Sequence, residues 1–160
     1  MTKTMEVKKS SHPVLRLSPY SLTFYYEWAR NPASTNYHTI IGDSLLKGSL
    51  DVARLQEAAG RFVKENYLFN SFVCLDDKGL YWEPNRGDSP LHFYHAETNV
   101  ELLEIVKAPF DLETGPLYKV VLHQISKQEF RCTLVAHHIL IDGSSVDFVN
   151  KSISEYCQHQ

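Results

Sequence analysis

The sequence predicts an α/β fold, a two-layer sandwich in which a mixed sheet carries helices. Strand and helix patterns alternate along the 160 residues, and short turns join some neighbouring strand patterns as hairpins. One long helix pattern has an apolar stripe suited to packing on a sheet. Because hairpins join antiparallel strands, they favour a mixed sheet over a purely parallel, doubly wound one.

The first expected elements are a helix, a strand and a second helix. The first helix starts after Ser18-Pro19, since serine is a good N-cap and proline suits the first helical position. It ends at Asn31-Pro32, and we interpret its aromatic residues as core. A strand follows over residues 37–47, and Gly48-Ser49 ends it and caps a helix over residues 50–64. The apolar residues of that helix recur close to the 3.6-residue period.

The rest of the chain continues the alternation, with a hairpin turn expected at residues 76–79. The spacing of Thr98 and Glu101 is that of a capping box, which starts a helix that ends before Pro109. A last helix is expected over residues 145–158. The strands are expected at residues 68–75, 80–83, 91–95, 117–125 and 130–140.

Composition and charge exclude several classes of protein. A chain of 160 residues with 43% hydrophobic content suffices for one compact domain, expected at residues 15–160 after a flexible leader at residues 1–14. The net charge of −3, without a basic cluster beyond the N-terminus, predicts no nucleic-acid or membrane partner. No apolar run is long enough to span a bilayer. Three widely spaced cysteines predict reduced thiols and a cytoplasmic location.

The most informative segment lies where the last long strand ends. There His137-His138 is followed, after three apolar residues, by Asp142-Gly143. Imidazoles at the end of a buried strand cost desolvation and add little packing, so one of them is expected to act on a substrate. Because adjacent strand residues point to opposite faces, the two histidines cannot share a role by geometry alone.

Other candidate site residues have simpler interpretations. His92, His95 and His123 do not have the spacing of metal ligands, and no cysteine or carboxylate cluster completes a site, so we interpret them as surface residues and expect no metal. Cys132 lies near the histidines in sequence. Only Arg131 next to it could lower its pKa, which favours packing over a nucleophilic role.

The spacing His-His-x-x-x-Asp-Gly resembles the active-site motif of the condensation domains of nonribosomal peptide synthetases, in the superfamily related to chloramphenicol acetyltransferase. The resemblance covers roughly residues 16–158 and corresponds to the N-terminal half of such a domain. Further segments resemble family patterns in the correct order: Ser18-Pro19 with Asn31-Pro32 and Tyr37, Gly48 to Leu55, Pro109 to Leu112, and Gly115 to Leu117.

The resemblance implies a chloramphenicol acetyltransferase-like fold with the active site in a tunnel between two halves. It implies amide bond formation, in which an amine on one carrier protein attacks the thioester of an acyl group on another. The phosphopantetheine arms of those carriers deliver the substrates, so no directly bound cofactor is expected. By match, His138 is the catalytic residue, which accepts or steers the amine proton or stabilises the tetrahedral intermediate. His137 is then expected to pack or to bond the backbone.

Asp142, Gly143 and Lys64 are expected to support the site. Asp142 either orients His138 as in a triad or, by the family pattern, forms a structural ion pair with an arginine that follows the first long helix. Lys64 stands at the arginine position and keeps the charge without the bidentate fork, which predicts a weakened Lys64–Asp142 pair. Gly143 either brings the next helix N-terminus near the histidine or is a plain turn residue.

The resemblance also sets the expected partners and the rival functions. The partners are acyl or peptidyl carrier proteins and the C-terminal half of the domain. With half the tunnel absent, the isolated chain is expected to be inactive, because electrostatic stabilisation is far weaker in open water. One rival is a free-standing acyltransferase of the superfamily that uses a small alcohol or amine. The other is a non-catalytic half-domain that binds a carrier protein or a partner half.

Overall fold

The computed structural model describes residues 5–8, 13–34, 38–86 and 91–158. Its main sheet has four strands in the order β2 (Thr39–Lys47), β7 (Glu129–His137), β6 (Tyr118–Ser126) and β5 (Phe93–Ala96). The β5–β6 pair is parallel and the other pairs are antiparallel, so the expected mixed sheet is confirmed. The strand start predicted at residue 37 lies outside the described residues.

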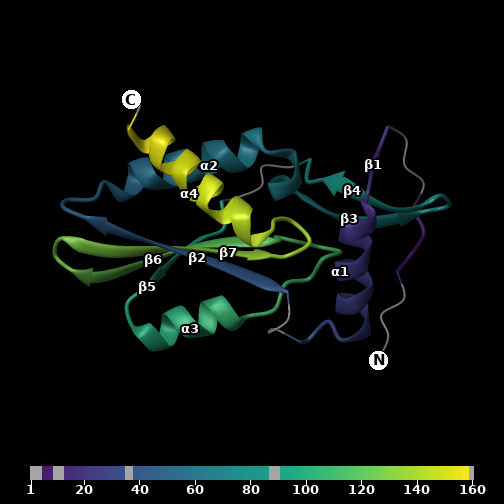
Figure 1. Cartoon of the computed structure of the whole chain (residues 1–160), viewed down its shortest axis with the longest axis horizontal. Helices are drawn as coiled ribbons and strands as arrows, with labels where there is room; N and C mark the ends of the chain where they lie inside the picture. Colours follow the sequence, from purple (N-terminus) through teal and green to yellow (C-terminus); the bar gives the residue numbers. More distant parts are fainter. Residues whose placement is uncertain (1–4, 9–12, 35–37, 87–90, 159–160) are drawn as a thin grey trace.

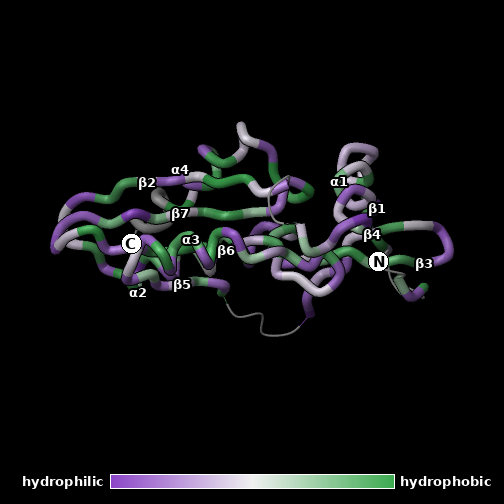
Figure 2. Tube along the Cα trace, turned by 90° about the horizontal axis from the view of Figure 1, so that it is seen from below, coloured by the Kyte–Doolittle hydropathy of each residue, from purple (hydrophilic) through white to green (hydrophobic). Residues whose placement is uncertain are grey.

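Helices α2 (Val52–Glu65) and α4 (Gly143–Gln158) cover one face of this sheet, as Figure 1 shows. Helix α3 (Asn99–Lys107) lies on the other side, near β5 and β6. Figure 2 shows the apolar stretches of the strands that form the buried middle of the molecule. No helix in the described part of the chain is long and apolar enough to cross a membrane.

A second, three-stranded sheet contains β1 (Leu15–Arg16), β4 (Gly79–Pro84) and β3 (Ser71–Asp76), all antiparallel. The sequence predicts one sheet, and this is a correction. Side chains alternate in the same way in every strand, so the pattern alone does not say which sheet a strand joins. The bidentate pair between Arg16 and Asp76, with N–O distances of 2.6 and 2.7 Å, fastens β1 to the β3–β4 hairpin.

Several boundaries differ from the predicted ones for local reasons. Regular structure starts at β1, before Ser18, because the hairpin offers β1 a free edge. Asp51 caps α2, rather than Gly48-Ser49, since its Oδ1 accepts the Arg54 N–H at 3.1 Å. The chain from Tyr67 to Asn70 forms a 3₁₀ turn, so β3 begins later than expected. Whether residues 1–14 form a flexible leader stays a prediction, although the Lys8 N–H donates to the Leu75 carbonyl at 2.7 Å.

Helix α1 (Pro19–Arg30) begins as predicted, with Ser18 as its N-cap. Its buried face is attached to the loop before β6. The Trp28 indole Nε1 donates to the Phe110 carbonyl at 3.0 Å, and the Tyr25 hydroxyl donates to Glu113 Oε1 at 3.1 Å. These two hydrogen bonds fix how the helix lies against the rest of the fold.

Candidate functional site

The histidine motif lies where β7 ends and α4 begins. Strand β7 ends at His137, three residues earlier than predicted, and the Leu140 N–H closes a turn on the His137 carbonyl at 2.9 Å. The apolar residues after His138 are buried in this turn. Helix α4 then begins at Gly143. A single tight turn therefore connects the two histidines to the helix.

His137 is part of the core, with only 4% of its surface exposed. Its Nδ1 accepts the Ile139 N–H at 3.1 Å, which places the ring proton on Nε2. Burial first, and then the neighbouring His38 and His138, lowers the pKa of His137 to about 3. A neutral imidazole enclosed in this way supports the structural role predicted for it.

His138 is half-buried, and its ring contacts side chains of helix α1. A hydrogen bond of 3.0 Å joins its Nδ1 to the Tyr20 hydroxyl. The Phe24 ring stacks on the imidazole, with 4.4 Å between centroids and 13° between planes. The His138 backbone N–H donates to the His38 carbonyl at 2.6 Å, just past the last β2–β7 pair. Both the ring and its backbone are therefore fixed.

A second imidazole, that of His38, also contacts Phe24. His38 Nε2 is 3.0 Å from Glu27 Oε2, and the Phe24 and His38 rings meet edge to face with 5.2 Å between centroids. Tyr20, Phe24, Glu27 and His38 were not predicted as site residues. The three α1 residues are spaced i, i+4 and i+7, the signal of a single helix face, and that pattern could have pointed to them.

Asp142 has neither of the partners considered for it. Its Oδ1 accepts the Ser145 N–H at 2.8 Å and the hydroxyls of Ser145 and Ser144 at 2.7 and 2.8 Å, which makes it the cap of α4. These bonds, the Ser145 hydroxyl first, lower the pKa of Asp142 to about 2. Within the described ranges, the ion pair expected between Lys64 and Asp142 is not formed. The adjacent serines satisfy the carboxylate instead.

Gly143 is the first residue of α4 and does not have a positive φ. A Cβ added there would meet nothing within 4 Å. The position therefore does not require glycine for backbone conformation or for space in this chain.

The remaining candidate residues lie away from the histidine turn, the segment from His137 to Gly143 that joins β7 to α4. His123 is buried, and its Nδ1 is bonded to the Ala96 carbonyl at 2.9 Å, which corrects its expected surface position. Burial first, and then Asp43, raises the pKa of the Cys132 thiol to about 11, so this thiol is a poor nucleophile at neutral pH. Among the residues that the structure describes, no three His, Cys, Asp or Glu side chains gather as a metal site.

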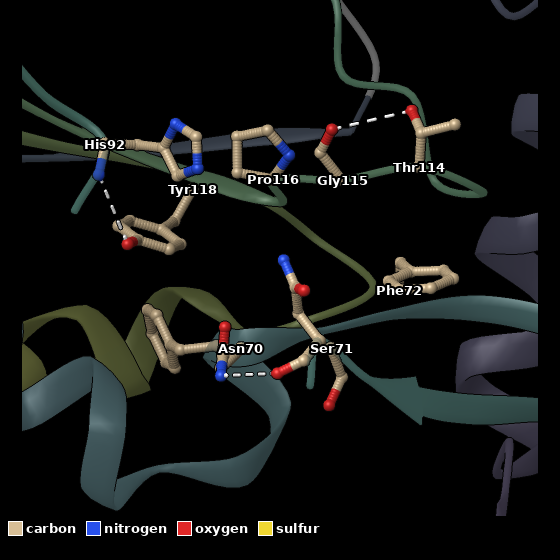
Figure 3. A pocket seen from close by; sticks show the side chains of 10 residues that line it. Asn70, Ser71, Phe72, His92, Thr114, Gly115, Pro116 and Tyr118 are labelled. Carbon is tan, nitrogen blue, oxygen red and sulfur yellow. Dashed lines mark hydrogen bonds between the residues drawn. The ribbon is translucent and has the colours of Figure 1, made fainter. Parts of the chain in front are cut away.

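A separate cavity of about 220 Å³ lies between the start of β3 and the Gly115-Pro116 turn (Figure 3). The Tyr118 hydroxyl accepts the His92 N–H there at 3.4 Å. Burial lowers the pKa of His92, which leaves it neutral at pH 7. None of the cavity's lining residues belongs to the histidine turn. We therefore place the candidate functional site at the α1–β7 contact, which contains two partnered imidazoles.

Comparisons with known proteins identify the family of this chain. The family model of the condensation domain matches residues 30–160. Tyrocidine synthase 2 of Brevibacillus parabrevis is 29% identical over 133 residues, which are 81% of this chain and 4% of that protein. The nonribosomal peptide synthetase kk1B of Curvularia clavata is 35% identical over 116 residues, 69% of this chain and 1% of that protein.

Among solved structures, the starter condensation domain of the rhizomide synthetase RzmA superposes with a TM-score of 0.78 at 16% sequence identity. The match covers 91% of this chain and 38% of that one. The chain thus spans a small part of its curated relatives and well under half of a solved condensation domain. It belongs to the condensation-domain family of nonribosomal peptide synthetases and has the chloramphenicol acetyltransferase-like fold of part of such a domain.

Proposed function

We propose that this chain supplies the histidine-bearing part of a condensation domain that forms amide bonds in natural product biosynthesis. The observation that carries the proposal is the position of His138, which is half-buried and held by Tyr20 and Phe24 while His137 beside it is fully buried. An imidazole fixed in position but open on one edge suits acid–base work on a substrate. Membership of the family supplies the reaction class.

In the proposed reaction, an amine attacks the carbonyl carbon of a thioester. The new C–N bond forms as one amine proton leaves, and the C–S bond breaks as the tetrahedral intermediate collapses. His138 receives or steers that proton, or stabilises the oxyanion, and the departing thiolate takes up a proton. The products are an amide and a free thiol, so the reaction needs no oxidant or metal.

The substrates are proposed to arrive on the phosphopantetheine arms of acyl or peptidyl carrier proteins. The C-terminal half of the domain is the second proposed partner, because this chain spans 38% of the solved relative. Without that half, His138 would face water, where electrostatic stabilisation of the intermediate is weak. We therefore expect no turnover from the 160-residue chain by itself.

The proposed roles of the supporting residues follow from their contacts. His137 packs in the core and accepts a backbone N–H, and Asp142 caps the helix that starts at Gly143. Lys64 is exposed at the end of α2 and is not paired with Asp142 in the described part of the chain. We propose that His137 and Asp142 act by holding His138 in place.

The test begins with the intact mass of the gene product in its source cell, which defines the protein to assay. That protein is then given an acyl thioester on one carrier protein and an amine on another, and the amide is measured by chromatography. His138→Ala is expected to lower turnover by ~10²–10⁴-fold, the usual contribution of a positioned acid–base group. His95→Ala is the matched control, because His95 is an exposed histidine on β5. Equal turnover in the wild type and His138→Ala would refute the catalytic role.

A second candidate is a non-catalytic module that binds a carrier protein or a partner half. This candidate predicts no turnover in any version of the gene product, with unchanged carrier affinity in His138→Ala. Calorimetric titration with a carrier protein measures that affinity.

A further inference from the structure

We propose that Tyr20 is the positioning residue of His138, and that its hydroxyl keeps the ring proton on Nδ1 so that Nε2 is the nitrogen presented to substrate. The assignment concerns a hydrogen bond of this chain and stands by itself. Its consequence for turnover rests on the proposed function.

The contact with Tyr20 allows this tautomer. The Tyr20 hydroxyl is 3.0 Å from His138 Nδ1, and 52% of the Tyr20 surface is exposed. A phenol is both a donor and an acceptor. In the proposed tautomer the Tyr20 hydroxyl accepts the Nδ1–H of His138 through a lone pair and donates its own proton to water.

The stacking of Phe24 limits the ring further. With its plane 13° from that of Phe24 and 4.4 Å between centroids, the imidazole has one face covered and does not rotate freely. Within the described ranges, no hydrogen bond is made by His138 Nε2. The free edge of the ring is therefore the Nε2 edge.

The usual orienting group is a carboxylate on Nδ1, and among the residues that the structure describes none is bonded to His138 Nδ1. The nearest acidic residue in the motif is Asp142, whose Oδ1 is bonded to Ser144 and Ser145. Tyr20, which comes 118 residues earlier, occupies the Nδ1 position instead. A neutral phenol orients the ring without adding a negative charge beside it.

His137 provides an internal contrast. Its Nδ1 accepts the Ile139 N–H, which is able only to donate, so His137 must carry its proton on Nε2. The two adjacent histidines are thus assigned opposite tautomers by different partners. The His137 signal is therefore a reference for the measurement on His138.

In the reaction, the Nδ1 proton of His138 stays on the ring throughout. The amine proton moves to Nε2 as the C–N bond forms, and the same Nε2 gives it to the thiolate as the C–S bond breaks. Tyr20 accepts from Nδ1 in both the neutral ring and the imidazolium, so it need not reorient between the steps.

The test compares Tyr20→Phe with Tyr26→Phe. Tyr26 is also exposed on α1 but lies on a different helix face, where its ring contacts that of Tyr25. Two-bond ¹H–¹⁵N correlation of the ¹⁵N-histidine-labelled chain reports which ring nitrogen carries the proton. We expect His138 to be protonated on Nδ1 in the wild type and in Tyr26→Phe, and to gain the Nε2–H form in Tyr20→Phe. Unchanged His137 signals would show that the variant is folded.

In the protein that shows turnover, Tyr20→Phe is expected to lower kcat at least tenfold with little change in KM. This effect is smaller than the ~10²–10⁴-fold loss expected from removal of the imidazole. Protonation of wild-type His138 on Nε2 would overturn the proposal, and so would a Tyr20→Phe variant with wild-type tautomer and kcat. If the tautomers behave as stated while His138→Ala keeps full turnover, the hydrogen-bond assignment stands and the proposed catalytic function fails.

Discussion

Gly42 of β2 lies directly beneath Val146 of α4, so close that a Cβ at residue 42 would overlap the valine side chain. The same Cβ would be 3.1 Å from Asn150 Nδ2. This absent side chain allows α4 to pack on the sheet beside the histidine turn. The relationship also explains why a strand of otherwise bulky residues contains a glycine at this point.

Gly42→Ala is expected to destabilise the fold by ~1–3 kcal/mol, because the added methyl overpacks the α4–β2 contact. Urea denaturation followed by circular dichroism measures the change. Gly60→Ala is the matched control: Gly60 lies inside α2, and a Cβ there would meet nothing within 4 Å. That variant should be more stable than the wild type by about 0.5–1 kcal/mol. Equal effects of the two substitutions would contradict the packing argument.

His137 makes stability depend on pH in a defined window. Its folded pKa of about 3 lies below the ordinary histidine pKa of 6.5, so between these values the unfolded chain binds the extra proton. Stability is therefore expected to fall as the pH drops below about 6.5, by up to ~1.4 kcal/mol per pH unit from this residue. His137→Asn keeps an acceptor at the δ position but does not titrate. Its free energy of unfolding should depend less steeply on pH between 6.5 and 4, and parallel curves for the two proteins would refute the prediction.

Asp142→Ala is expected to lower the melting temperature, because the N-terminal turn of α4 loses its cap. Asp142→Asn should lower the melting temperature less, since the amide oxygen still accepts the Ser145 N–H. Lys64→Met serves as the control, because the Lys64–Asp142 ion pair is not formed among the described residues. Its melting temperature should equal that of the wild type. A decrease in melting temperature as large as that of Asp142→Ala would restore the ion-pair interpretation.

Lys119 is a buried lysine of β6 that holds the end of α3. Its Nζ donates to the carbonyls of Ile105 and Ala108 at 3.0 and 2.6 Å and lies 4.5 Å from the centre of the Phe110 ring. Lys119→Met is expected to cost ~1–3 kcal/mol of stability, because two carbonyls lose a charged donor. Lys127→Met, in the exposed turn after β6, should leave the midpoint of urea denaturation unchanged.

The parts of the fold that local chemistry decides could be predicted from the sequence. Ser18-Pro19 starts α1 because the cap and the fixed proline φ act within one turn. The end of β7 could not be predicted, since the residues after His138 are apolar in a buried turn just as they would be in a strand. The β3–β4 hairpin was predicted, but the pattern does not tell that it forms a second sheet with β1 instead of extending the main one.

The site shows the same division between local and distant effects. The motif indicates His138, and the i, i+4, i+7 spacing on α1 indicates that Tyr20, Phe24 and Glu27 share a helix face. Which group that face contacts depends on how the helix docks, and this is not encoded locally. For Asp142 the sequence predicts an ion pair with the distant Lys64, whereas the adjacent serines bind the carboxylate. Closing a loop of two or three residues costs far less entropy than closing one of about 80. The carboxylate of Asp142 is therefore bound by the adjacent serines.

The attachment of α1 through Trp28 and Tyr25 has a further consequence. Both hydrogen bonds end on the segment between Phe110 and Glu113. The position of this loop therefore determines where α1 lies, and with it the distance between the Tyr20 hydroxyl and the His138 imidazole. The indole of Trp28 on α1 donates to this loop, so a change in Trp28 fluorescence would report a change in how α1 is attached. Changes made far along the sequence, near residue 110, should be seen first as altered alignment at His138.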